Sequence, residues 1–268
     1  MSKLLNRTLH VMGLKKKVNY SNFNEQKIIR SLLGVLPLKN KFCVDVAAGD
    51  GLYMSNTYQL FSSGWAGVAV EFDPRSFAKL ARRYMGFPEV QLFKTKVTPS
   101  NVVNLLRTAD APRDLAFLSL DIDGYDHFVM DALLASFRPF LICAEINEKI
   151  PPPIRFTVKF DPGYQWHEDH FYGQSLSMLE TLAKKWKYAL VGLEYNNAFL
   201  VPQEHAKKFK QLSAGEAYQK GYLGKKDRLQ KMPWNKDMED LQKMEPAQAI
   251  RVLRKRFKKY EGQYICKL

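Results

Sequence analysis

The chain has 268 residues, of which 46% are hydrophobic and 25% charged, and a formal net charge of +14. This length and apolar content are sufficient for one α/β domain with a sizeable core and an additional segment. No stretch reaches the roughly 20 apolar residues of a membrane-spanning helix, which excludes a protein anchored by such helices.

The first 37 residues are predicted to form a basic, helical leader. Leucines alternate with lysine and arginine in residues 1–20, without the continuous apolar run and small-residue cleavage site of a secretory signal. A polar helix is predicted over residues 22–36. The cysteines, Cys43, Cys143 and Cys266, are odd in number and lack metal-ligand spacing. Reduced core cysteines are typical of a cytoplasmic protein, which is the predicted location, either free or peripheral to a membrane.

Residues 38–202 alternate between strand-length apolar runs and helical patterns. The predicted strands are 42–47, 66–71, 90–94, 114–121, 139–146, 187–193 and 197–201. The predicted helices between them are 51–62, 74–85, 99–108, 126–137 and 174–186. This alternation predicts a Rossmann-like α/β fold, with a doubly wound, mostly parallel sheet covered by helices on both faces. Because only Glu194-Tyr195-Asn196 separates the last two strands, they are predicted to pair as an antiparallel C-terminal hairpin.

The first strand runs into a glycine-containing turn, Val44-Asp45-Val46-Ala47-Ala48-Gly49-Asp50-Gly51. The second strand ends at Glu71 about 20 residues later, which is the layout of a nucleotide-binding βαβ unit with an acidic residue for the ribose hydroxyls. Asp50 would repel phosphate, so the pattern favours a nucleoside that lacks phosphates and carries a positive centre. S-adenosylmethionine fits this description. The turn alone is equally typical of an ordinary connection between a strand and a helix.

Carboxylates recur where the predicted parallel strands end. Asp121 and Asp123 follow the fourth strand, and Glu145 and Asn147 lie at the end of the fifth. Because ligands bind outside the carboxyl ends of such strands, these oxygen donors are predicted to hold a cation, either a sulfonium or Mg²⁺ or Mn²⁺. A metal there would lower the pKa of a hydroxyl that is being methylated. Asp123 is also typical of a helix cap.

An imidazole offers another route to deprotonating a hydroxyl. His127, next to Asp126, is the first candidate, and His167 and His170 follow in a segment that is equally typical of a surface loop. The predicted catalytic residues are therefore Asp121, Asp123 and His127.

Several segments together carry a family resemblance. They are Asp45 to Glu71 with Ser55-Asn56-Thr57 and Gly64-Trp65-Ala66-Gly67, then Ser119-Leu120-Asp121-Ile122-Asp123-Gly124-Tyr125-Asp126, Glu145-Ile146-Asn147 and Tyr172-Gly173-Gln174-Ser175-Leu176. This pattern resembles a group of class I S-adenosylmethionine methyltransferases related to FkbM-type sugar and polyketide O-methyltransferases, over residues 40–202. The resemblance implies the class I methyltransferase fold and S-adenosylmethionine as cofactor.

The resemblance also implies roles for single residues. Asp45, Gly49 and Gly51 would line the methionine end of the cofactor, Glu71 the ribose, Phe72 with Thr95 and Lys96 the adenine, and Asp121 the methyl group. Ala47, Asp50, Asn56 and Asp73 complete the predicted cofactor site. The predicted metal ligands are Asp121, Asp123, Glu145 and Asn147.

Hydroxyl oxygen is the predicted methyl acceptor. The Asn/Asp-Pro-Pro-aromatic motif for exocyclic base nitrogens does not follow the fourth strand, and neither Cys43 nor Cys143 lies on a predicted active-site loop. A sugar hydroxyl of a glycan or glycolipid is the first choice. RNA ribose is one alternative, and a non-catalytic binding module of the same fold is another. Residues 148–173 are the predicted substrate loop, whose aromatic residues either stack on a sugar or form a lid's own core: Phe160, Tyr164, Trp166, Phe171 and Tyr172.

Residues 203–268 are predicted to form a basic helical extension, with 17 Lys and Arg against 8 Asp and Glu. The charge predicts a polyanionic partner, RNA or an anionic membrane surface, although charge alone is more typical of a solvated surface. Ile250, Leu253, Phe257 and Tyr260 fall on one helical stripe. This stripe either lies on a membrane or packs on the catalytic domain, and packing is the preferred interpretation.

Overall fold

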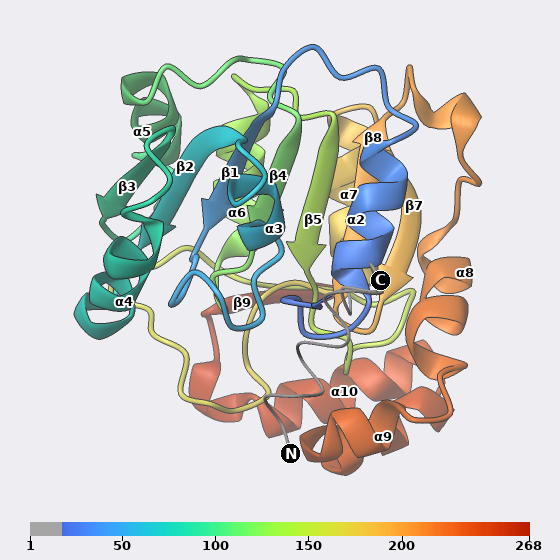
Figure 1. The fold of residues 1–268 in the computed structure, drawn as a ribbon. Helices are drawn as coiled ribbons and strands as arrows, with labels where there is room; N and C mark the ends of the chain where they lie inside the picture. The colour runs from blue at the N-terminus through green and yellow to red at the C-terminus, as the bar shows by residue number, and fades with distance from the viewer. Residues whose placement is uncertain (1–17) are drawn as a thin grey trace, which may run out of the picture.

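A computed structural model describes residues 18–268, so residues 1–17 of the predicted leader lie outside the described residues. The helix predicted over residues 22–36 is present as α2 (Glu25–Leu33). The main sheet has seven strands in the order β3-β2-β1-β4-β5-β8-β7 (Figure 1). These strands are β1 (Phe42–Val46), β2 (Ala66–Glu71), β3 (Val90–Lys94), β4 (Phe117–Leu120), β5 (Leu141–Glu145), β7 (Tyr188–Glu194) and β8 (Asn197–Pro202). Neighbouring pairs among β1 to β5 are parallel, and β8 is antiparallel to both β5 and β7.

Helices cover both faces of this sheet. They are α2 (Glu25–Leu33), α3 (Tyr58–Phe61), α4 (Pro74–Tyr84), α5 (Val102–Thr108), α6 (Asp126–Leu134) and α7 (Leu176–Lys185). Strand side chains point alternately to the two faces. Cys43 and Phe117 therefore share a core with α2, α3 and α4, while Val44 and Leu118 share a core with α5, α6 and α7.

A parallel sheet completed by an antiparallel hairpin is the topology of class I methyltransferases, which confirms the predicted fold class. Each predicted strand is present, with ends that differ by a few residues at β4 and β5. The hairpin turn consists of Tyr195 and Asn196, as the short spacing required.

The helix predicted over residues 51–62 is wrong for most of its length, because only α3 is helical there. Gly51 and Met54 have positive φ angles of 77° and 55°, which a right-handed helix excludes. The Asp50 carboxylate also accepts the backbone N–H groups of Leu52 and Tyr53, each at 2.9 Å. This local hydrogen bonding competes with a helix and produces an open loop beside the end of β1.

A second sheet, absent from the sequence prediction, joins β6 (Arg155–Val158) to β9 (Tyr264–Lys267) in antiparallel register. It connects the predicted substrate loop to the end of the extension. Between β8 and β9 lie short 3-10 segments (Ala206–Lys208, Pro233–Lys243 and Lys258–Tyr260), a π-helical turn (Gln219–Leu223), and α8 (Ala214–Tyr218), α9 (Arg228–Lys231) and α10 (Pro246–Arg256). Figure 1 shows α9 and α10 below the arrowheads of β1 and β5, so the extension covers the carboxyl end of the sheet.

The apolar stripe of the extension is buried. Ile250, Leu253, Phe257 and Tyr260 belong to a third core that includes Phe171 of the substrate loop. The packing interpretation of the stripe is confirmed, and these side chains are not free to enter a membrane. Within residues 18–268, no helix has the length and apolar character needed to cross a bilayer.

Candidate active site

A cavity of about 710 Å³ lies at the carboxyl ends of β1, β2, β3 and β4. We call it the first cavity. Its volume falls in the range of about 300–1,000 Å³ that is usual for small-molecule sites. The lining includes every predicted cofactor residue except Asp50 and Gly51: Asp45, Ala47, Gly49, Asn56, Glu71, Phe72, Asp73, Thr95, Lys96 and Asp121.

Glu71 joins the turn after β1 to the turn after β2. Its Oε2 accepts the N–H of Gly49 at 2.8 Å, and its Oε1 accepts the N–H of Asp73 at 2.7 Å. A carboxylate has about four acceptor positions, so two remain for hydroxyl groups of a ligand. Gly49 has a φ of 57° and open space where a Cβ would lie, so its backbone faces the cavity without obstruction. Ala47 adopts a φ of 66°, a strained value for alanine that accompanies this tight turn.

The structure places Asp50 and Gly51 outside the first cavity. Asp50 forms an ion pair with Arg83 of α4 at 2.6 Å. Desolvation opposes its ionisation, but the N–H bonds from Tyr53 and Leu52, followed by Arg83, hold its pKa below the usual range. The prediction that Asp50 repels phosphate is therefore wrong, because its charge is compensated by Arg83 and it does not line the first cavity. Gly51 packs against α4, where a Cβ would come within 2.5 Å of Leu80.

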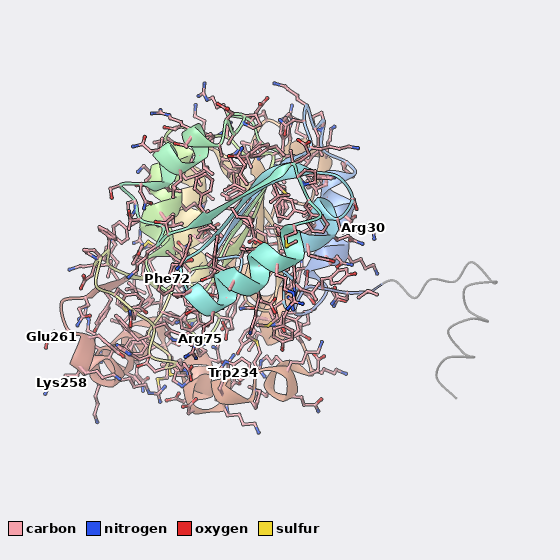
Figure 2. The ribbon with its side chains drawn as sticks, turned by 60° about the vertical axis from the view of Figure 1, so that its left-hand side comes forward. Arg30, Phe72, Arg75, Trp234, Lys258 and Glu261 are labelled. Atoms are coloured by element: carbon pink, nitrogen blue, oxygen red, sulfur yellow. The ribbon has the colours of Figure 1, made fainter. Side chains whose placement is uncertain are left out.

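The opposite wall comes from the turns after β2 and β3. Phe72 is 52% exposed although it lines the cavity, and Figure 2 labels it at the end of β2. Asp73 caps α4 by accepting the N–H of Arg75 and of Ser76. Lys96 donates from Nζ to the carbonyl oxygens of Pro162 at 2.8 Å and Tyr164 at 2.6 Å. The predicted substrate loop is thus fixed to the edge of the cofactor-sized cavity.

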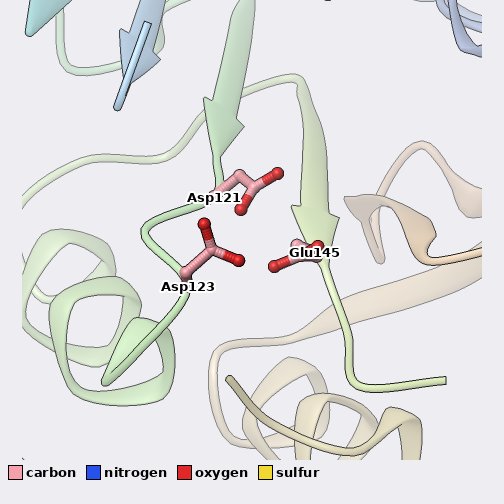
Figure 3. A group of neighbouring side chains, drawn as sticks. All are labelled: Asp121, Asp123 and Glu145. Atoms are coloured by element: carbon pink, nitrogen blue, oxygen red, sulfur yellow. The ribbon is translucent and has the colours of Figure 1, made fainter. Parts of the chain in front are cut away.

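Asp121, Asp123 and Glu145 converge from the ends of β4 and β5 (Figure 3). Each offers a carboxylate oxygen that lies within 4.8 Å of the other two. Burial and mutual repulsion raise the pKa of Glu145 well above its usual value, and burial raises that of Asp121. Burial, followed by repulsion from Asp121 and Asp126, raises the pKa of Asp123 to about 8.

Two further buried aspartates surround this cluster. Burial raises the pKa of Asp45 to about 7, although Thr57 donates a hydrogen bond to its Oδ2 at 2.5 Å. Burial raises the pKa of Asp126 to about 6. Asp126 accepts the N–H groups of Ile122 at 2.8 Å and Gly124 at 2.9 Å, so it shapes the loop that carries Asp123. Asp123 itself has a φ of 52° and does not cap α6.

The donor set fits a hard divalent cation, because every ligand atom is a carboxylate oxygen. Glu145 Oε2 is buried and has no hydrogen-bond partner within the described part of the chain. The predicted ligand Asn147 donates from its amide nitrogen to the carbonyl oxygens of His170 and Tyr172, and it does not line the first cavity. Its Oδ1 is buried without a hydrogen-bond partner within the described residues, so its role as a ligand stays a prediction.

His127 is not brought to the site. Its Nδ1 lies 3.3 Å from Gln174 Oε1, burial lowers its pKa, and it does not line the first cavity. His170 instead lines a second cavity, which adjoins the first, and its Nε2 lies 2.8 Å from Asp237 Oδ2. The prediction of His127 as the first base candidate is therefore not supported by its position.

The second cavity has a volume of about 1,130 Å³. The two share lining residues, namely Met54, Asn56, Asp121, Asp123 and Trp166. The carboxylate cluster therefore lies where the two cavities meet.

Of the aromatic residues predicted for the substrate loop, Tyr164 and Trp166 line the first cavity, and Trp166 and Tyr172 line the second. Phe171 is core, and Phe160 lines neither cavity.

Sequence reasoning missed two contributors to the second cavity. Lys149 is 2% exposed, and its Nζ contacts Glu148 Oε1 at 3.3 Å and donates to the Tyr172 hydroxyl at 2.8 Å. Its position just after β5 was a usable signal. Trp234 and its neighbours come from the extension, and no local pattern links them to a strand end.

No protein-family profile matches this sequence, and no curated protein sequence matches it. Among solved structures, the chain is similar to the methyltransferase domain of bacterial CtHen1-C, with 14% identity and a TM-score of 0.42 over 69% of this chain and 99% of that one. It is similar to magnesium protoporphyrin IX methyltransferase from Synechocystis PCC 6803 with bound SAM, with 10% identity and a TM-score of 0.42 over 68% and 79%. It is also similar to the N-terminal domain of EvdMO1 in the presence of SAH and D-fucose, with 8% identity and a TM-score of 0.43 over 67% and 82%.

Proposed function

We propose that this protein is an S-adenosylmethionine-dependent methyltransferase that methylates a hydroxyl oxygen, with a sugar as the acceptor. The observation that carries the proposal is the meeting of two cavities at one carboxylate cluster. The first cavity has the size and position of a nucleoside site in an open α/β sheet. The second gives an acceptor access to the same atoms.

The charge of the first cavity supports a cationic ligand. Its lining carries the carboxylates of Asp45, Glu71, Asp73, Asp121 and Asp123. The lining also contains Lys96, whose ammonium group already donates to two carbonyl oxygens. The pKa values of Asp45, Asp121 and Asp123 are raised, so a bound sulfonium would favour their charged form and be attracted to it. The phosphates of a nucleotide would instead meet the Asp73 carboxylate, whose pKa is lowered by hydrogen bonds from the start of α4.

The second cavity supports a neutral acceptor over RNA ribose. Asp121, Asp123, Glu145, Glu168, Asp169 and Asp237 line it together with the lysines Lys149 and Lys236. A phosphate backbone would be repelled by this excess of carboxylates. Amide groups such as Asn196 and Asn197 also line it, and they offer both donors and acceptors to sugar hydroxyls.

The cluster residues have a direct role in the proposed reaction. Bound S-adenosylmethionine supplies a methyl group that is transferred from sulfur to the acceptor oxygen, leaving a neutral thioether. Asp123 accepts the hydroxyl proton as the oxygen–carbon bond forms, since a pKa of about 8 lies near physiological pH, where a proton acceptor works best. Glu71 orients the ribose, and Asp121 lies at the junction where the methyl group would point.

Alternatively, Asp121, Asp123 and Glu145 would hold Mg²⁺ or Mn²⁺, and the orphaned Glu145 Oε2 supports this assignment. Asp123 would then be a metal ligand and not the proton acceptor. Such an ion would bind the acceptor hydroxyl and lower its pKa.

Calorimetry with S-adenosylmethionine and with its demethylated product tests the cofactor assignment. We expect both to bind with one site per chain, and a nucleotide such as ATP to give no heat, because the lining repels phosphate. A folded protein that binds neither sulfur nucleoside would end the methyltransferase proposal.

The ligand-free protein is expected to lose stability as pH rises. Asp126, Asp45 and Asp123 have pKa values of about 6, 7 and 8, all raised from the usual value near 4. The folded state therefore binds more protons than the unfolded state between about pH 4 and 8, and stability falls across this window. Thermal unfolding in excess chelator should show a lower Tm at pH 8 than at pH 5.

Two comparisons make this result specific. Asp45→Asn should flatten the pH dependence, because it removes one of the titrating groups. Mg²⁺ or Mn²⁺ should raise Tm at pH 8 more than at pH 5, because ionised carboxylates bind the cation, and Glu145→Gln should abolish that gain. A metal-independent Tm at pH 8 would contradict the metal assignment.

A further inference from the structure

Trp234 is a large exposed side chain on the wall of the second cavity. It is 55% exposed, and Figure 2 labels it among the segments of the extension. It is the second residue of the 3-10 segment Pro233–Lys243. Met232, Pro233, Lys236 and Asp237 line the same cavity. An exposed indole in a concave site is more typical of ligand contact than of scattered surface hydrophobicity.

The residues on either side of Trp234 hold it in place. Met232 is 2% exposed and belongs to the main core. Asn235 is 1% exposed, and its Nδ2 donates to Glu148 Oε1 at 2.7 Å and to the Tyr222 hydroxyl at 2.9 Å. The indole is therefore presented from an anchored segment, which reduces the ordering entropy lost when a ligand binds.

Trp166 of the substrate loop lines the same cavity and also the first one. Its Nε1 donates to the carbonyl oxygen of Asp169 at 2.8 Å, so the polar atom of the indole is already satisfied. Its ring lies 5.6 Å from that of Tyr172, measured between centroids. What Trp166 offers a ligand is consequently an aromatic face beside the carboxylate cluster.

We propose that Trp234 and Trp166 together bind the ring of a neutral pyranose acceptor, and that the extension thereby determines acceptor specificity. This inference rests on the methyltransferase function proposed above. A pyranose has apolar C–H faces that match indole rings and a rim of hydroxyls that match the amides and carboxylates of the wall. The extension, in this view, is part of the acceptor site and not only a charged appendage.

The test measures two ligands separately in one protein. Calorimetry with the demethylated cofactor reports the first cavity. Saturation-transfer NMR with a panel of methyl pyranosides, in the presence of that product so that no turnover occurs, reports the second. The variants are Trp234→Ala, Trp166→Ala and Trp234→Phe. Phe160→Ala is the matched control, because Phe160 is 37% exposed in the same loop and lines neither cavity.

We expect at least one pyranoside to bind the wild type, with affinity about tenfold or more weaker in both alanine variants, as for loss of a central aromatic contact. Trp234→Phe should retain most of the binding and Phe160→Ala all of it. The two Trp234 variants and Phe160→Ala should bind the demethylated cofactor normally, because neither Trp234 nor Phe160 lines the first cavity. Unchanged pyranoside binding in Trp234→Ala would overturn the inference. So would a protein that binds the cofactor product but no pyranoside, or that binds an RNA oligonucleotide in this cavity instead. Failure to bind the cofactor product would count against the methyltransferase proposal itself.

Discussion

Replacing Glu71 with alanine should weaken S-adenosylmethionine binding more than any other single change in the first cavity. The two acceptor positions left free by Gly49 and Asp73 are those proposed for the ribose hydroxyls. Hydrogen bonds to a charged acceptor contribute about 1.5–3 kcal/mol each, so the loss of two predicts a dissociation constant about 10²–10⁴-fold higher. Calorimetry on the folded variant measures this directly.

Asp50→Asn is the matched control, because Asp50 lies in the same turn but outside the cavity. Asparagine keeps the oxygen that accepts the N–H groups of Leu52 and Tyr53. We expect its effect on the dissociation constant to stay within about threefold, as for a surface substitution. Equal losses in the two variants would show that the turn as a whole, and not the Glu71 carboxylate, is what the ligand requires.

Leu253→Ala should destabilise the whole protein by about 2–5 kcal/mol, the usual range for removing a buried leucine from a core. Leu253 of α10 is fully buried in the core that includes Phe156 of β6 and Phe171 of the substrate loop. Because this core supports the substrate loop, the substitution should also disturb the wall of the second cavity. Urea unfolding gives the change in free energy, and pyranoside binding reports whether the cavity wall persists.

The double variant Lys255→Ala and Lys258→Ala is the control for the charge of the extension, because both side chains are exposed. Its stability should stay within about 0.5 kcal/mol of the wild type. If the extension also binds an anionic surface or RNA, as its charge predicts, this variant should lose affinity for anionic vesicles or RNA, and the wild-type affinity should fall as salt rises. An affinity that changes neither with salt concentration nor in this variant would contradict a polyanionic partner.

The sequence by itself determined the layers of the fold and much of the first cavity. Strand-length apolar runs define the buried strands, and the three-residue gap before Asn197 leaves only an antiparallel hairpin. Glu71 and Asp121 were predictable because the carboxyl ends of parallel strands meet at one edge, whatever the loops between them do. Short-range spacing and periodicity carry this information.

Only the tertiary structure decided the features that depend on long-range pairing or on competing local hydrogen bonds. Asp50 is turned to Arg83, 33 residues away, which no spacing rule anticipates. The β6–β9 sheet pairs Arg155 with Lys267, and this brings the extension to the carboxyl end of the sheet. Trp234 thereby joins the second cavity, while His127 is directed to Gln174. Which side chains share a cavity is set by packing between segments that are distant in the chain, and a local sequence pattern does not contain it.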